Sequence, residues 1–165
     1  MGRYDLVTEW WVETSPEQTW NVLADYASWP KWWSGIRAVE LLSSGDHRGV
    51  GAVLRQRWRS RLPYTLVFDL TMDGIDRLRR LDGLASGDLE GDCAWTFTED
   101  AGGTLVRFSV AVRPTRWWMN LPLPFAGLVF RSNFDAIMGW GRAGLANSLG
   151  VRVEDRTAQA RRGLG

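Results

Sequence analysis

Apolar and polar residues alternate along several stretches of the chain, a pattern typical of strands with one buried and one solvated face. In residues 4–13, Leu6, Trp10 and Val12 share one face while acidic residues occupy the other. The alternation returns in the middle of the chain, where clusters of Gly, Ser and Asp interrupt it as turns do. It predicts six more antiparallel strands, at 36–43, 49–60, 63–73, 77–86, 88–99 and 103–113.

Helical spacing replaces the alternation in two places. After the first strand, Ser15 is a predicted N-cap and Pro16 suits the first helical position, so we expect two short helical segments, the second ending at Gly35. Near the C-terminus, apolar residues recur every three or four positions and predict a long helix at about 125–150 with one buried face. Residues 151–165 are polar, Arg-rich and without periodicity, so we expect a flexible tail.

Tryptophan is the most distinctive component of the chain, with eleven among 165 residues. Large rigid indole rings are suited to filling a core or lining an apolar cavity. The net charge of +1 supplies no overall field that would attract nucleic acid, so we expect no nucleic-acid partner. One histidine, His47, and one cysteine, Cys93, form no ligand cluster, so we expect no metal and no cofactor.

The sequence predicts a soluble cytoplasmic protein without stable membrane insertion. Its first residues contain no apolar stretch of signal-peptide type. The most apolar segment, 117–130, is broken by Pro122 and Pro124 and is too short to span a bilayer. A lone cysteine cannot form an internal disulfide, which favours a reducing compartment. No pattern indicates an oligomeric state.

Five local motifs accompany this order of elements: Ser-Pro-Glu-Gln-Thr-Trp at 15–20, and the segments 25–33, 87–91, 102–104 and 138–141. Together they resemble the START-like superfamily, also called SRPBCC, and within it the branch of polyketide cyclase/dehydrase and lipid-transport proteins. The resemblance covers roughly residues 4–150. It rests on packing and turn positions, so it is specific for fold and says little about activity.

The resemblance implies an α+β protein with the helix-grip fold. In this fold a seven-stranded curved antiparallel sheet wraps around the long C-terminal helix, and two short helices follow strand 1. Residues 1–150 would then form a single START-like ligand-binding domain, followed by the tail at 151–165. Members of the superfamily carry hydrophobic ligands in a cavity between the sheet and the last helix.

Strand parity and the stripe of the last helix select the residues that we expect to line such a cavity: Leu54, Gln56, Trp58, Tyr64, Leu66, Phe68, Trp95, Phe108, Phe130 and Phe134. Typical small-molecule sites enclose ~300–1,000 Å³. Gly141 and Gly144 would help by keeping the helix face small. Gln56 and Tyr64 are the polar members, and each needs a partner: a ligand carbonyl or hydroxyl, another protein group, or a buried water.

Other candidate residues have a structural and a functional interpretation. We expect His47 to be an exposed turn residue and Cys93 an inert, buried small residue, neither with a functional role. The stripe Arg55, Arg57, Arg59 and Arg61 predicts a solvated outer face, with a phosphate or nucleic-acid contact as the alternative. The apolar segment 117–125 could be a packed corner, a gate, or a patch that touches membrane during ligand loading.

The leading hypothesis is binding, for transport or sequestration, of a hydrophobic small molecule such as a lipid, polyketide or aromatic compound. One alternative is an enzyme of the polyketide cyclase/dehydratase type that uses the same cavity, with Tyr64 or a carboxylate as its acid/base group. Another is a START-like protein associated with ribosomes or quinones. A carrier predicts an almost wholly apolar lining, an enzyme convergent ionisable groups, and a ribosome binder a contiguous basic surface.

Overall fold

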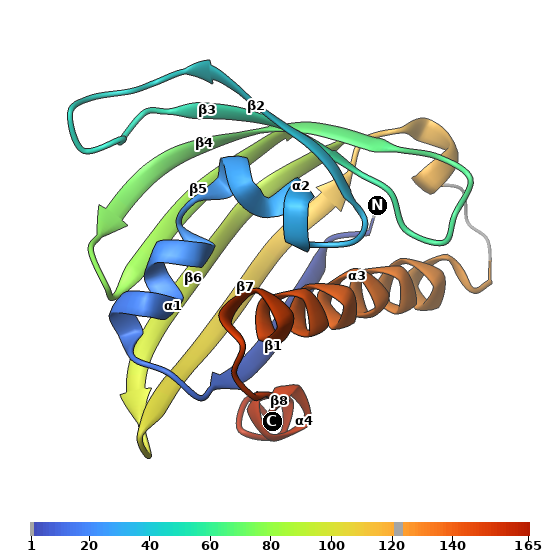
Figure 1. Cartoon of the computed structure of the whole chain (residues 1–165). Helices are drawn as coiled ribbons and strands as arrows, with labels where there is room; N and C mark the ends of the chain where they lie inside the picture. The colour runs from blue at the N-terminus through green and yellow to red at the C-terminus, as the bar shows by residue number, and fades with distance from the viewer. Residues whose placement is uncertain (1, 121–123) are drawn as a thin grey trace.

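The computed structural model describes residues 2–120 and 124–165 of the chain. In this described part, one antiparallel sheet of eight strands has the order β2-β3-β4-β5-β6-β7-β1-β8. Figure 1 shows the sheet curving around the long helix, which lies on its concave side together with the short helices. The strands are β1 (Tyr4–Val12), β2 (Ile36–Ser43), β3 (Val53–Trp58), β4 (Leu66–Asp76), β5 (Arg80–Gly87), β6 (Leu89–Asp100), β7 (Gly103–Pro114) and β8 (Val153–Asp155).

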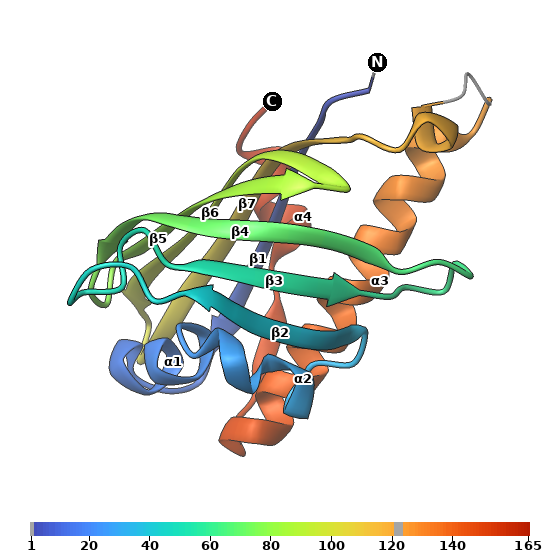
Figure 2. The same ribbon diagram turned by 90° about the horizontal axis from the view of Figure 1, so that it is seen from above.

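The long helix α3 (Ala126–Leu149) runs along the concave side of the sheet, and the short helices α1 (Pro16–Leu23) and α2 (Trp29–Trp32) lie toward one end of it (Figure 1 and Figure 2). Figure 2 shows α1 and α2 near the end of the long helix α3, while the start of α3 points away from them. The arrangement confirms the predicted α+β helix-grip fold, including the long C-terminal helix and the short helices after the first strand. The helical segments are α1 (Pro16–Leu23), η1 (Tyr26–Ser28), α2 (Trp29–Trp32), η2 (Trp117–Asn120), α3 (Ala126–Leu149) and α4 (Thr157–Arg162).

The C-terminal segment differs from the expectation of a flexible tail and supplies the strand that makes the sheet eight-stranded rather than seven-stranded. β8 pairs with β1, and α4 follows it. The segment covers the outer face of β1 around Trp11, whose ring lies 5.2 Å from the guanidinium carbon of Arg156. Val153 of β8 and Ala160 of α4 are the buried residues of the segment itself. An apolar Trp11 on the supposedly solvated face was the sequence signal that something covers this strand.

Asp73-Gly74 lies at the end of the predicted strand 63–73 and was expected to form the turn before the predicted strand 77–86. This prediction is wrong. β4 continues through Gly74 to Asp76, and the register against β5 shifts between Met72 and Gly74, as in a β-bulge. A glycine inside a strand often marks such a bulge rather than a turn. The chain reverses after Asp76 instead, where Leu78 adopts a left-handed backbone with φ of 68°.

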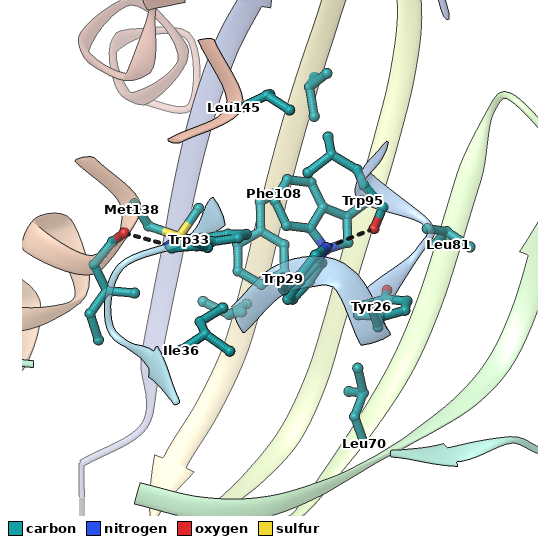
Figure 3. Close-up of a cluster of buried hydrophobic side chains, with 14 of the residues drawn as sticks. Tyr26, Trp29, Trp33, Ile36, Leu70, Leu81, Trp95, Phe108, Met138 and Leu145 are labelled. Carbon is teal, nitrogen blue, oxygen red and sulfur yellow. Dashed lines mark hydrogen bonds between the residues drawn. The ribbon is translucent and has the colours of Figure 1, made fainter. Parts of the chain in front are cut away.

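Tryptophan rings fill the interior at the end of the groove where α2 meets α3 (Figure 3). Trp33 is 1 % exposed, and its ring lies 4.9 Å from that of Trp29 and 5.9 Å from that of Trp10. The indole Nε1 of Trp33 donates to the carbonyl oxygen of Ile137 on α3, at 2.8 Å. This bond and the ring contacts fix α2 against the last helix.

Two glycines of α3 make the close approach possible. A Cβ atom at Gly141 would overlap the Trp33 indole, and one at Gly144 would overlap the carbonyl oxygen of Trp32. The sequence predicted that these glycines would leave room for a ligand. They leave room for α2 instead, so this part of the interior is packed with protein.

Candidate ligand-binding pocket

A partly enclosed pocket of about 90 Å³ lies between the sheet and the N-terminal half of α3. Of the ten residues predicted to line a cavity, the structure brings nine around this pocket: Gln56, Trp58, Tyr64, Leu66, Phe68, Trp95, Phe108, Phe130 and Phe134. Leu54 is buried in the core but does not line it. None of the described lining residues carries a charge at neutral pH.

Sequence reasoning missed eleven further lining residues: Tyr26, Trp29, Ser60, Leu70, Ala85, Leu89, Cys93, Val110, Val112, Asn133 and Ile137. Strand parity contained the signal for several of them, because Leu70 follows Leu66 and Phe68 on one face of β4, and Val110 follows Phe108 on β7. Tyr26 and Trp29 come from the short helices, whose position over the sheet is a tertiary feature without a local signal.

The pocket is smaller than the expected ~300–1,000 Å³. Aromatic side chains account for the difference, since Tyr26 and Trp29 from the short helices project into the space over the sheet (Figure 3). On the sheet itself, the rings of Trp95 and Phe108 stack with centroids 4.3 Å apart. Several of the tryptophan side chains that suggested a large cavity therefore occupy the space where it was expected.

An outer hollow of about 450 Å³ adjoins the pocket and shares Tyr64 and Phe130 with it. Its other described lining residues are Tyr4, Leu62, Pro114, Trp118, Met119, Pro124, Phe125, Ala126 and Val129. Tyr64 makes an edge contact with Trp118 at 4.6 Å, and Phe130 stacks on Tyr4 at 4.2 Å. The two shared rings therefore border both the small inner pocket and the wider apolar hollow.

Gln56 is the most deeply buried polar residue of the pocket, with 1 % of its surface exposed. Its Oε1 accepts a hydrogen bond of 2.7 Å from the indole Nε1 of Trp58. Among the described residues, its Nε2 has no hydrogen-bond partner. Gln56 thus brings an unused pair of N–H donors to the wall of an otherwise apolar space.

The ionisable groups of the pocket are held in their protonated, neutral forms. Burial raises the pKa of the Cys93 thiol to about 12, and the nearby carboxylates Asp73, Asp92 and Asp82 act in the same direction. Burial also raises the pKa of the Tyr26 hydroxyl. The pKa of Tyr64 is raised by burial as well, against a smaller opposite effect of Arg116.

The other candidate residues lie as follows. His47 is exposed in the turn before β3. Cys93 was predicted to be a buried core residue. It is half-buried instead and forms part of the pocket wall. Arg55 pairs with Asp69 on the neighbouring strand at 2.8 Å, as expected of an outer face. Arg59, farther along the stripe, lines a separate polar groove on the surface.

The apolar segment before α3 is partly packed and partly exposed. Trp118 packs on Tyr64, whereas Trp117 and Phe125 are 76 % and 69 % exposed. Residues 121–123 of this segment lie outside the described residues. Within the described ranges, no helix has the length and apolar character needed to cross a membrane.

The model of a protein family described as polyketide cyclase / dehydrase and lipid transport matches residues 6–149. The chain belongs to this family. The match confirms the resemblance to START-like proteins seen in its motifs. No curated protein matches the sequence significantly.

Solved structures with the same fold are similar to this one over most of its length. The Zhui aromatase/cyclase from Streptomyces sp. R1128 has a TM-score of 0.70 at 12 % identity, covering 89 % of this chain and 93 % of that one. Ara h 8.0201 has a TM-score of 0.66 at 20 % identity, covering 90 % and 99 %. A START superfamily protein from Mycobacterium smegmatis has a TM-score of 0.63 at 16 % identity, covering 89 % and 93 %. At these identities the likeness establishes the fold alone.

Proposed function

We propose that this protein binds a hydrophobic small molecule for transport or sequestration, with part of the ligand in the inner pocket and the rest in the outer hollow. The observation that carries the proposal is the wall of the inner pocket. Twenty described residues line it with aromatic, aliphatic and a few neutral polar groups, and none of these residues is charged. Such a surface favours an apolar ligand, because transfer of apolar area out of water is favourable.

The size of the space sets the form of the ligand. A cavity of ~150 Å³ holds one benzene ring with room around it, and the inner pocket of about 90 Å³ is smaller, so it suits one small ring or a short chain. The outer hollow offers several times that volume beyond Tyr64 and Phe130. A ligand of lipid, polyketide or aromatic type would therefore extend past these two rings.

A catalytic role is less well supported. A cyclase or dehydratase that works by general base catalysis needs a group near the substrate that takes up a proton. The ionisable groups among the described lining residues are Tyr26, Tyr64 and Cys93, and burial raises the pKa of all three. They remain protonated at neutral pH and can donate a proton or hydrogen bond but not accept a proton, which favours binding over turnover.

The test compares two substitutions on adjacent residues of β5 that face opposite sides of the sheet. Ala85 lines the pocket, whereas Leu84 is 44 % exposed on the outer face. Ala85→Phe places a ring inside the pocket, and Leu84→Phe adds similar bulk outside it. The measurement is quenching of tryptophan fluorescence by brominated fatty acids and brominated aromatic compounds, since Trp29, Trp58 and Trp95 line the pocket.

We expect saturable quenching in the wild type, at least tenfold weaker binding in Ala85→Phe, and binding within twofold of the wild type in Leu84→Phe. Native mass spectrometry of the protein purified from its own host would identify what it carries. Quenching that is unchanged in Ala85→Phe, or that does not saturate, would contradict the proposal.

A further inference from the structure

Gln56 interrupts an apolar stripe. On the inner face of β3 it stands between Leu54 and Trp58, where every other position is apolar, and it is almost fully buried. A buried amide group without a partner destabilises the folded protein, because its hydrogen bonds to water are lost and not replaced. Because buried polar groups in folded proteins are nearly always satisfied, an exception of this kind points to a partner that binds.

The orientation of the Gln56 amide is set by its neighbour. The indole Nε1 of Trp58 carries a hydrogen and can only donate, so the atom that it contacts at 2.7 Å must be the amide oxygen. The amide nitrogen is therefore the atom left over, with two hydrogens and no acceptor among the described residues. What the pocket lacks is a hydrogen-bond acceptor at this position.

The electrostatics of the wall restrict that acceptor to an uncharged group. No cationic side chain lines the pocket in the described part of the chain, so a carboxylate or phosphate placed there would lose its hydration without a counter-ion. A hydroxyl would bring an O–H of its own that needs another acceptor in a largely apolar space. A carbonyl oxygen only accepts and would use the Gln56 nitrogen without creating a new unsatisfied donor.

We propose that Gln56 determines ligand specificity by donating its Nε2 hydrogens to the carbonyl oxygen of an uncharged, apolar carbonyl compound such as a ketone, ester or quinone-like ring. This inference rests on the proposed ligand-binding function and names the chemical class that the pocket selects. The apolar body of the ligand contacts the aromatic wall, and the carbonyl group points toward β3.

The experiment uses two probes of the same shape, cyclopentanone and methylenecyclopentane, in which a CH₂ group replaces the carbonyl oxygen. Both are titrated into ¹⁵N-labelled full-length protein and followed by two-dimensional NMR. The chain has only three glutamines, Gln18, Gln56 and Gln159, so the Gln56 side-chain signals are assigned by their loss in Gln56→Leu. We expect cyclopentanone, but not methylenecyclopentane, to shift the Gln56 Nε2 signals downfield in the wild type.

Affinities in variants provide the second measurement. Loss of one neutral hydrogen bond corresponds to a decrease of about two- to thirteenfold in affinity. Gln56→Leu and Gln56→Met should therefore bind cyclopentanone more weakly by that factor. Methylenecyclopentane should bind within twofold of its wild-type affinity in both variants. The matched control is Thr8→Val, which removes the other buried polar side-chain atom that has no partner among the described residues, from a residue that does not line this pocket. This substitution should leave the affinity for both probes unchanged.

The outcomes separate the inference from the function beneath it. If both probes bind but the Gln56 signals respond equally to each, or the Gln56 variants weaken both alike, Gln56 has a structural role or holds a buried water, and the inference is overturned. If neither probe binds and Ala85→Phe has no effect on larger apolar ligands, the proposed function fails with it. The shift itself is measured in the wild type, and the loss of the Gln56 signals in either folded variant, Gln56→Leu or Gln56→Met, provides the assignment.

Discussion

The two ends of the space between the sheet and α3 are built from the same kinds of residue and have opposite results. At the α2 end, Trp33 meets Gly141 so closely that a single added carbon would overlap its ring. At the other end, Phe130 and Phe134 of the same helix border a pocket. Aromatic richness alone therefore does not predict a cavity. What decides is whether the facing element approaches to contact distance.

Small residues mark the packed end, and large ones mark the hollow end. Glycine lets α2 approach the axis of α3, and the indole rings then interdigitate as in any dense core. Where α3 presents Phe130 and Phe134, these rings border the inner pocket instead of a docked helix. The site thus depends on an asymmetry along one helix, which substitutions can test.

The largest effect is expected from truncation of Trp33 at the packed end. Trp33→Ala should lower the free energy of unfolding by ~3–5 kcal/mol, the usual cost of removing a buried tryptophan, because the ring is 1 % exposed and packs against several other indoles. Phe134→Ala should cost markedly less, since Phe134 is half-buried beside existing space. Urea denaturation measures both, and equal losses would contradict the distinction between the two ends.

Glycine substitutions along α3 should have intermediate effects of opposite sign. Gly141→Ala should destabilise the protein by ~1–3 kcal/mol through overpacking against Trp33. At Gly139, only two residues away, an added Cβ atom would meet no neighbouring element within 4 Å, so Gly139→Ala should stabilise the helix by ~0.5–1 kcal/mol. Thermal and urea unfolding of the two variants provide the comparison. A stabilising Gly141→Ala would show that α2 does not dock as closely as described.

A smaller difference in the free energy of unfolding is expected between substitutions of Thr8 and Gln56, which carry the buried polar atoms that lack a partner among the described residues. Thr8→Val should raise the free energy of unfolding by about 1 kcal/mol, because it removes a buried hydroxyl without a partner and conserves shape. Gln56→Leu should leave stability nearly unchanged, because it removes one unsatisfied donor but deprives the Trp58 Nε1 of its acceptor. Urea denaturation without ligand tests this. A clear loss of stability in Gln56→Leu would mean that its amide already has a partner.

Local patterns in the sequence predicted the sheet, the long helix and nine of the twenty described residues that line the pocket. Alternation placed Gln56, Trp58 and Phe108 on the inner face correctly, because parity is a property of the strand itself. The size of the pocket was not predictable in this way. It depends on how Trp29 and Tyr26 lie over the sheet and on α2 seated against Gly141, contacts between segments far apart in the chain.

The C-terminal segment shows the same limit from the other direction. Residues 152–156 alternate too briefly to indicate a strand, and β8 has only three residues. It forms along the edge of β1, where the backbone N–H of Glu9 donates to the Thr157 hydroxyl at 3.1 Å and Arg156 lies over the Trp11 ring. The local sequence gives only a weak strand signal here, and pairing with β1 determines the structure of this segment.

The Cys93 thiol lies in the wall of the inner pocket and can therefore test whether the hollow end excludes water. Burial raises the pKa of this thiol to about 12 in the folded protein, against an ordinary value of 9.0, and the carboxylates of Asp73, Asp92 and Asp82 act in the same direction. Between these two values the unfolded chain has lost the thiol proton while the folded protein retains it. The unfolded state then binds fewer protons, so the free energy of unfolding falls as pH rises through this window.

Wild type and Cys93→Ala should therefore show the same pH dependence of stability from about pH 6 to about pH 8 and diverge above about pH 9, with the wild type losing more. Urea denaturation at stepped pH measures the divergence, and other titrating groups cancel because both proteins contain them. At about pH 8 the thiol of the folded protein should react with iodoacetamide far more slowly than that of the protein in urea. Parallel pH profiles with rapid alkylation would mean that water enters the pocket freely, and the contrast between a packed end and a dry hollow end would then fail.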